Sequence, residues 1–131
     1  MILNYDCLRD TLLKLEEILL ITDDLAFSPV NLDALCGELP LYEKEDVFYC
    51  IFLLNNARYI QADITYLANG GVRTLAIKTL TWEGHEFLET IRPDSTWQKI
   101  KEYLAAVGGK SIHAIKFIGV KLLEAKINTI F

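Results

Sequence analysis

The chain has 131 residues, of which 52% are hydrophobic, and a formal net charge of −5. A chain of this length can bury a core as one domain. Charged residues at 14, 16 and 17 interrupt its longest leucine-rich stretch, and the N-terminus lacks the order of a signal peptide. The three cysteines, Cys7, Cys36 and Cys50, have no paired spacing for a metal or redox site. We therefore expect a reduced, cytoplasmic protein with no membrane partner.

The charge is unevenly distributed along the chain. Residues 1–65 contain 12 acids and 4 bases, a net charge of −8, and residues 66–131 contain 6 acids and 9 bases, a net charge of +3. A domain that binds duplex nucleic acid usually carries a clustered basic footprint. The sequence has no run of basic residues, so its composition argues against that class.

Three helices are predicted in the first part of the chain. Asn4 or Asp6 can cap the first helix, whose leucines recur at helical spacing on one face. Residues 27–30 are predicted to be extended, because a proline follows Ser28. Asn31 then caps a short second helix, and the third helix is predicted over about 43–59.

A β-hairpin is predicted next. Strands over 61–67 and 72–80 flank Asn69-Gly70, a strong signal for a tight turn. Thr81 is placed to cap the helix that begins at Trp82.

Two more helices are predicted after Pro93, which cannot continue the preceding helix. Ser95 and Gln98 have the spacing of a capping box for the first of them, and Gly108-Gly109 ends it. Ser111 can cap the last helix, predicted to run to about Asn128.

These elements predict an α+β fold that is mainly α. The order of three helices, a hairpin and a further helix is that of a winged helix with two or three extra C-terminal helices. Residues 1–92 would form the core, with the hairpin wing at about 61–80, and residues 93–131 a helical extension packed on that core, within a single domain overall.

The run LTWEGHEFLETIR-D-STW, between Leu80 and Trp97, resembles the hallmark of a phage and prophage family known as domain of unknown function 2513. A leucine-rich first helix and a C-terminal GG-S helix fit the same family, so the resemblance covers nearly the whole chain. The resemblance implies a winged-helix-like fold and a mobile-element origin, and it carries over no site residues. The chain departs from the family at 53–58, where such proteins end the third helix in a glycine-containing turn and this chain has Arg58.

The third helix of a winged helix normally offers one face to the DNA major groove. A projection at ~100° per residue places Val47, Cys50, Ile51 and Leu54 on the inner face. The outer face then carries Glu45, Tyr49, Phe52 and Asn56. Base edges and phosphates are read by Arg, Lys, Asn and Gln, so one acid and two aromatic rings make a poor DNA reader.

The aromatic outer face has two explanations. It is either core covered by the C-terminal helices or a surface that docks a protein or a second copy. The last helix adds to the second explanation because it has two apolar sides and therefore needs two partners. One side carries Ile115, Ile118 and Leu122, and the other carries Phe117, Val120 and Ile127.

An enzyme is not expected. His85 lies between Glu83 and Glu86, but a zinc site needs three or four converging ligands and the other histidine, His113, has no acid at helical spacing. We therefore expect no metal, no cofactor and no catalytic residue, and we interpret His85 as a structural residue that hydrogen-bonds near the hairpin.

Trp82 and Trp97 are interpreted as core aromatics that wedge the hairpin against the helices, with a partner anchor as the alternative.

The sequence predicts a non-enzymatic protein-interaction accessory of phage or prophage type. Its partner-binding residues would be Glu45, Tyr49, Phe52 and Asn56. The partner would be a host or phage protein, and binding would modulate host defence or transcription. The alternative is a winged-helix DNA-binding regulator that acts as a homodimer. Its phosphate contacts would come from Arg73, Lys78, Lys116 and Lys121.

Overall fold

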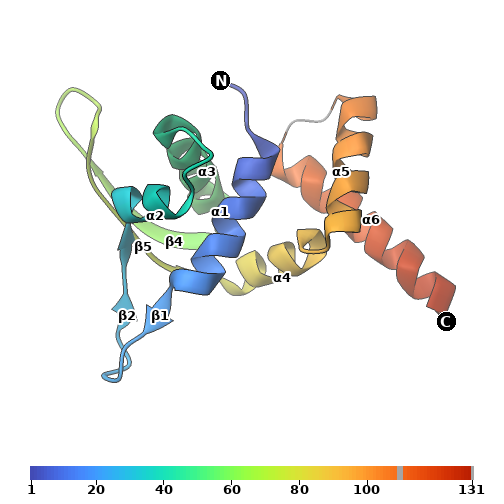
Figure 1. Cartoon of the computed structure of the whole chain (residues 1–131), viewed down its shortest axis with the longest axis horizontal. Coiled ribbons are helices and arrows are strands. Elements are labelled where there is room, and N and C mark those ends of the chain that lie inside the picture. Colours follow the sequence, from blue (N-terminus) through green and yellow to red (C-terminus); the bar gives the residue numbers. More distant parts are fainter. Residues whose placement is uncertain (109–110, 131) are drawn as a thin grey trace. The chain divides into compact units, whose positions relative to one another are not determined.

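The computed structural model describes residues 1–108 and 111–130. The chain divides into two compact units, Met1–His85 and a second unit that begins at Glu86. Both contain helices, and the strands lie in the first unit (Figure 1). The fold is therefore α+β and mainly helical, as predicted.

The first unit contains three complete helices. They are α1 (Tyr5–Ile18), α2 (Leu32–Glu38) and α3 (Lys44–Asn56). Asparagine side chains cap the first two, since Asn4 Oδ1 accepts from the Cys7 NH at 3.0 Å and Asn31 Oδ1 accepts from the Ala34 NH at 2.8 Å. Asn4 was one of two predicted caps for α1, and Asn31 was the predicted cap for α2.

The predicted hairpin is formed by β4 (Ile60–Tyr66) and β5 (Val72–Leu80), which pair in antiparallel register from Ile60 opposite Leu80. Gly70 has a φ of +89°, which a tight turn requires. A short strand, β3 (Val30–Asn31), pairs with the other edge of β5, so the sheet order is β3-β5-β4.

A separate ribbon precedes α2 and was not predicted as a pair. It consists of β1 (Leu20–Ile21) and β2 (Phe27–Ser28), in antiparallel register. The prediction of extended backbone over 27–30 is confirmed, because β2 and the first residue of β3, Val30, lie in it.

The core of the first unit lies between α1, α3 and the sheet. The inner face of α3 is buried as predicted, at Val47, Cys50, Ile51 and Leu54. The three cysteines are free thiols, and Cys7 and Cys50 are buried. A hydrogen bond with Cys7 and burial together raise the pKa of the Cys50 thiol, so this thiol stays protonated.

Helix α4 (Trp82–Ile91) spans the boundary between the units, and the second unit continues with α5 (Asp94–Val107) and α6 (Ile112–Ile130). The capping box predicted for α5 is wrong. Pro93 is the N-cap, with extended backbone and no side-chain cap of its own, and the Trp97 NH bonds to the Pro93 carbonyl at 2.9 Å. Pro93 cannot continue the preceding helix, and α5 begins directly after it at Asp94, ahead of Ser95.

The ends of α5 and α6 match the prediction where they are described. Gly108 ends α5 with a φ of +72°, and Ser111 Oγ caps α6 by accepting from the Ala114 NH at 3.1 Å. Gly109, the second residue of the predicted break, lies outside the described residues. In the described part of the chain, no helix is long and apolar enough to cross a membrane.

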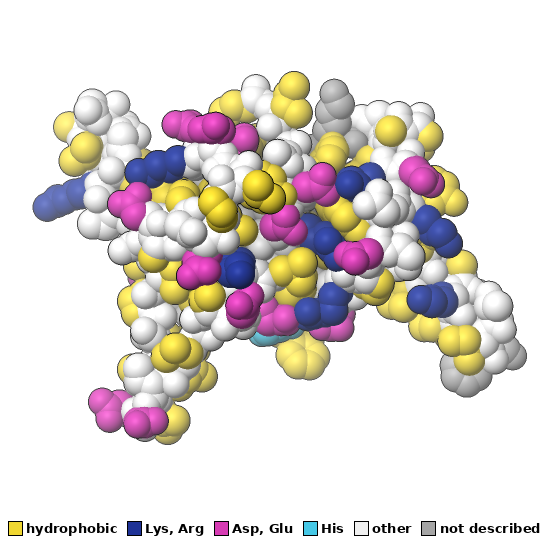
Figure 2. Space-filling model, viewed as in Figure 1, with side chains coloured by type: hydrophobic (Ala, Val, Ile, Leu, Met, Phe, Trp, Pro, Cys, Tyr) yellow, Lys and Arg dark blue, Asp and Glu magenta, His cyan; other side chains and the backbone are white. Residues whose placement is uncertain are grey.

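Charge is divided unequally between the units. The first contains 13 acids and 6 bases, a net charge of −7, and the second contains 5 acids and 7 bases, a net charge of +2. On the face drawn in Figure 2, acidic side chains lie among the basic ones over both units. The alternation gives this face no basic stripe of the kind that nucleic acid requires.

Candidate protein-docking surface

The outer face of α3 is partly open. Tyr49 and Phe52 are half-buried, and Glu45 and Asn56 at the two ends are exposed. The centroids of the Phe48 and Phe52 rings lie 6.3 Å apart, with an angle of 37° between the ring planes. These two rings connect the two ends of the face. Aromatic pairs of this separation attract each other, so the face presents a continuous aromatic strip.

A groove of about 670 Å³ lies at the N-terminal half of this strip. Its apolar lining consists of Met1, Ile2, Leu32, Phe48, Tyr49 and Val72, and its charged lining of Lys44, Glu45 and Asp46. Ile2 is 79% exposed. We call this the α3 groove.

The rim of the α3 groove is acidic. Lys44 is held by Asp33, with 3.0 Å between Nζ and Oδ1, so the single lysine of the rim is already neutralised. Among the side chains, Glu45 and Asp46 then leave the rim with a net charge of −2. A partner that fits must be apolar at its centre and cationic at its edge.

A second hollow of about 650 Å³ lies at the other end of the strip and contains the remaining predicted residues, Phe52 and Asn56. Its other lining residues come from the end of α3 and from β4. They are Asn55, Ala62, Asp63, Ile64, Thr65 and Tyr66. The four predicted residues therefore share one helix face but divide between two hollows.

The end of α3 differs from the prediction, since the helix stops at Asn56 and not near Tyr59. The Tyr59 NH bonds to the Leu54 carbonyl at 2.9 Å and the Arg58 NH to the Asn55 carbonyl at 3.1 Å. These two bonds form a Schellman motif, which places Arg58 in the left-handed region with a φ of +65°. Glycine is the usual residue there, and sequence periodicity does not register such a turn.

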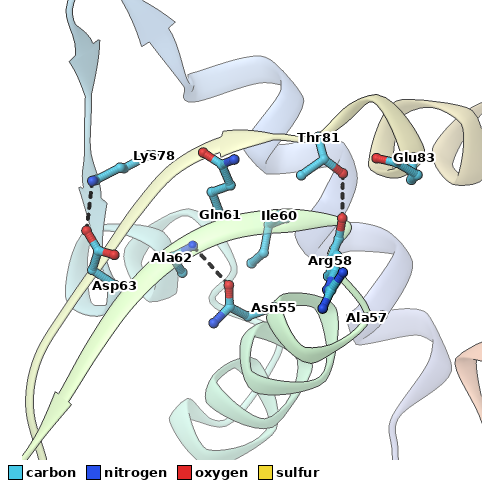
Figure 3. A pocket seen from close by; sticks show the side chains of 10 residues that line it. All are labelled: Asn55, Ala57, Arg58, Ile60, Gln61, Ala62, Asp63, Lys78, Thr81 and Glu83. Atoms are coloured by element: carbon cyan, nitrogen blue, oxygen red, sulfur yellow. Dashed lines mark hydrogen bonds and ion pairs between the residues drawn. The ribbon is translucent and has the colours of Figure 1, made fainter.

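The hallmark sequence holds this turn in place (Figure 3). Thr81 Oγ1 donates to the Arg58 carbonyl at 2.6 Å and accepts from the Gly84 NH at 3.0 Å, which confirms Thr81 as the cap of α4. A Cβ on Gly84 would lie 1.9 Å from the Tyr59 carbonyl oxygen, so only glycine fits. The signature is therefore scaffold that fastens the start of α4 to the α3–β4 turn.

A polar groove of about 610 Å³ lies beside this junction (Figure 3). Asn55 Oδ1 accepts from the Ala62 NH at 3.0 Å, and Lys78 Nζ lies 2.8 Å from Asp63 Oδ2. Two of its polar side chains, Asn55 and Lys78, are thus bonded to neighbouring residues of the lining.

The residues of the DNA-binding alternative do not form one cluster within either unit. Arg73 and Lys78 are exposed on β5 in the first unit, and Lys116 and Lys121 are exposed on α6 in the second. Lys78 pairs with Asp63, and Lys121 Nζ lies 3.6 Å from Glu124 and 5.7 Å from the centre of the Phe117 ring. The exposed ion pairs Lys78–Asp63 and Lys121–Glu124 contribute little to the stability of the fold.

The interpretation of Trp82 as core is wrong, whereas that of Trp97 as core is confirmed. Trp82 is 76% exposed and Trp97 is 1% exposed. The buried side of α4 is formed by Gly84, Phe87, Leu88 and Ile91. Trp82 lies two residues before Gly84, about 200° around the helix, so its ring faces away from that side.

His85 is also exposed, and the hydrogen bond described for it is made by its backbone NH to the Thr81 carbonyl. The predicted side-chain bond to the hairpin region is absent from the described residues. Among those residues, no group of three His, Cys, Asp or Glu side chains could hold a metal ion.

Comparison with known protein families identifies the family of this chain. The model of the family described as "Hypothetical protein (DUF2513)" matches residues 2–111, which includes every element from α1 to α5. The chain belongs to this family.

The chain is also similar to an uncharacterized protein of Haemophilus influenzae, to which it is 31% identical over 122 residues. That match covers 92% of this chain and 94% of the relative. No solved structure matches the chain significantly.

Proposed function

We propose that this DUF2513 protein is a non-enzymatic protein-interaction accessory of phage or prophage type that docks a host or phage protein on the outer face of α3. The observation that carries the proposal is the α3 groove, which combines exposed apolar side chains with an acidic rim. The partner would insert an apolar side chain between Phe48 and Ile2 and place Lys or Arg beside Glu45 and Asp46.

The same features disfavour a nucleic-acid partner for α3. A helix in the major groove must bring cations within reach of phosphates, and the rim would instead bring two carboxylates to a polyanion. Burial of the exposed apolar side chains gives a protein partner about 25 cal/mol for each Å² removed from water.

The test is affinity co-purification of the tagged full chain from its native host, with quantification of each captured protein. The double variant Tyr49→Ala, Phe52→Ala should lose a specific partner at least about 30-fold, which corresponds to two ordinary hot-spot contacts. Leu41→Ala is the matched control, because Leu41 is exposed in the same unit outside the groove. Equal capture by wild type and a folded double variant would end this proposal.

A dimeric winged-helix DNA-binding regulator is the second candidate. The sheet order β3-β5-β4, with the β4–β5 hairpin as a wing and Arg73 exposed on it, favours this candidate. It predicts duplex binding that weakens steeply with salt and with Arg73→Ala. An absence of duplex binding at low salt would exclude it.

A further inference from the structure

The β1–β2 ribbon (Figure 1) carries a leucine at its tip in a conformation that leucine rarely adopts. The tip is the loop Asp23-Asp24-Leu25, which lies between Thr22 and Ala26, and Leu25 has a φ of +63°. Hairpin loops of this length are commonly closed by a left-handed residue at their end, but glycine is the residue that suits this position. A bulky side chain with a positive φ is an outlier, and such strained residues cluster at sites of binding and function.

Hydrogen bonds within the loop hold Leu25 in this conformation. The Thr22 NH donates to the Ala26 carbonyl at 2.8 Å, and the Leu25 NH donates to the Thr22 carbonyl at 2.8 Å. The Ala26 NH donates to Thr22 Oγ1 at 3.2 Å. The Leu25 side chain contributes little to this arrangement, since it is 85% exposed. The loop therefore presents a leucine to solvent in a fixed position, and a preorganised contact loses little conformational freedom on binding.

The apolar surface continues from the tip down the ribbon. Ile21 and Phe27 lie directly opposite each other in the register of β1 and β2, so their side chains share one face, and both are exposed. These two side chains also line a hollow of about 320 Å³, together with Leu19 and Leu80 among others. A partner that covers Leu25 can therefore extend its apolar contact along the ribbon.

The charge of the tip indicates the class of partner. Asp23 and Asp24 are exposed beside Leu25, and neither pairs with a cation in the part of the chain that the structure describes. Residues 19–29 contain no lysine or arginine. Nucleic acid and anionic lipid surfaces would repel the two carboxylates. A protein with an apolar socket bordered by lysine or arginine complements both the leucine and the aspartates.

We propose that the β1–β2 ribbon is a second protein-docking element, in which Leu25 inserts into an apolar socket of a partner protein and Asp23 and Asp24 pair with lysines or arginines at the rim of that socket. The strained loop positions the leucine for insertion. This role goes beyond the docking function of α3 and does not depend on it, because no residue of the ribbon lines the α3 groove.

Photocrosslinking from position 26 of the full chain, in its native host, tests the proposal. Ala26 is exposed beside Leu25, so a photoreactive residue at position 26 leaves the leucine and both aspartates in place. The expected product is a covalent adduct with a protein. Mass spectrometry of the crosslinked peptides should place the contact site of that protein in an apolar socket bordered by lysine or arginine.

Variants at position 25 separate binding from folding. Leu25→Gly should lower the yield of the adduct at least about 10-fold, because the inserted side chain is lost. The same change should raise the Tm by about 2–5 °C, since glycine adopts this φ without strain, so unfolding cannot explain the lost adduct. Leu25→Asn should also lose the adduct, because asparagine tolerates the left-handed region. Leu41→Gly is the matched control and should keep the full yield, since Leu41 is an exposed leucine of the same unit without a positive φ.

The double variant Asp23→Asn, Asp24→Asn tests the charge and should lower the yield about 3-fold or more, because the pairs with the rim are lost. An unchanged yield in this variant or in Leu25→Gly would overturn the proposal. It would also be overturned by an adduct with lipid or nucleic acid, by a contact site without lysine or arginine, or by the absence of any adduct. A Tm that does not rise in Leu25→Gly would contradict the strained presentation of the leucine.

Discussion

At the scale of single residues, Arg58 shows how the chain holds an unfavourable conformation. Its φ of +65° suits glycine, and a side chain there costs about 1–2 kcal/mol. Two backbone hydrogen bonds of the Schellman motif and the hydroxyl of Thr81 fix the turn regardless. The sequence already shows the missing glycine as a departure from the family, and the structure has a left-handed turn at Arg58 without the glycine.

We therefore predict that Arg58→Gly raises the free energy of unfolding by about 1 kcal/mol, measured by urea denaturation. Arg58→Ala is the control, because it removes the guanidinium and keeps the Cβ in the left-handed region. Equal stabilisation by both variants would show that the charge, and not the backbone, is responsible.

Tyr42 provides a test by pH. Its hydroxyl donates to Asp10 Oδ2 at 2.5 Å, and burial, followed by this bond, raises the pKa of Tyr42 well above its usual value near 10. Tyr42→Phe should lower the free energy of unfolding at pH 7 by about 1–2 kcal/mol, since a bond to a charged acceptor is lost. A raised folded-state pKa gives stability that is complete below pH 10 and is lost as the pH rises further.

The difference between wild type and Tyr42→Phe should therefore shrink from pH 10 to pH 11, because Tyr42 ionises first in the unfolded chain. Urea denaturation of both proteins between pH 7 and pH 11 measures it. A difference that grows with pH in this window would contradict the assigned bond.

At the scale of elements, the junction between the α3–β4 turn and α4 explains the hallmark sequence. We predict that Gly84→Ala destabilises the protein by more than about 3 kcal/mol or prevents folding, because the new methyl group would collide with the Tyr59 backbone carbonyl. Gly37→Ala in α2 is the matched control. A Cβ there meets no atom within 4 Å, so this change should stabilise the protein by about 0.5–1 kcal/mol. Thermal unfolding separates the two outcomes, and a well-folded Gly84→Ala would contradict the junction.

Elements with strong local signals were predictable from the sequence. The caps Asn31, Thr81 and Ser111 and the inner face of α3 follow from side-chain chemistry and periodicity. The ribbon β1–β2 and the strand β3 could not be predicted, because two-residue strands have no period and depend on distant partners such as β5. The exposure of Trp82 was missed because aromatic rings are buried on average, although the helix start at Trp82 was predicted correctly and helical spacing places this ring opposite Gly84, Phe87 and Leu88.

At the scale of the whole molecule, the two units carry opposite net charge. The α3 groove lies in the acidic first unit, and the apolar groove between α5 and α6 lies in the second unit. The residues of both surfaces were visible in the sequence as apolar positions, but the grooves depend on side chains from several elements.

The most direct test of the docking function is site-specific photocrosslinking from position 45, on the rim of the α3 groove, in the native host. The account predicts a discrete crosslinked protein that is absent when the photoreactive residue is placed at position 41. It also predicts that Phe48→Ala abolishes this crosslink. A crosslink to nucleic acid, or the same protein pattern from both positions, would contradict the assignment of the α3 groove as a protein-docking surface.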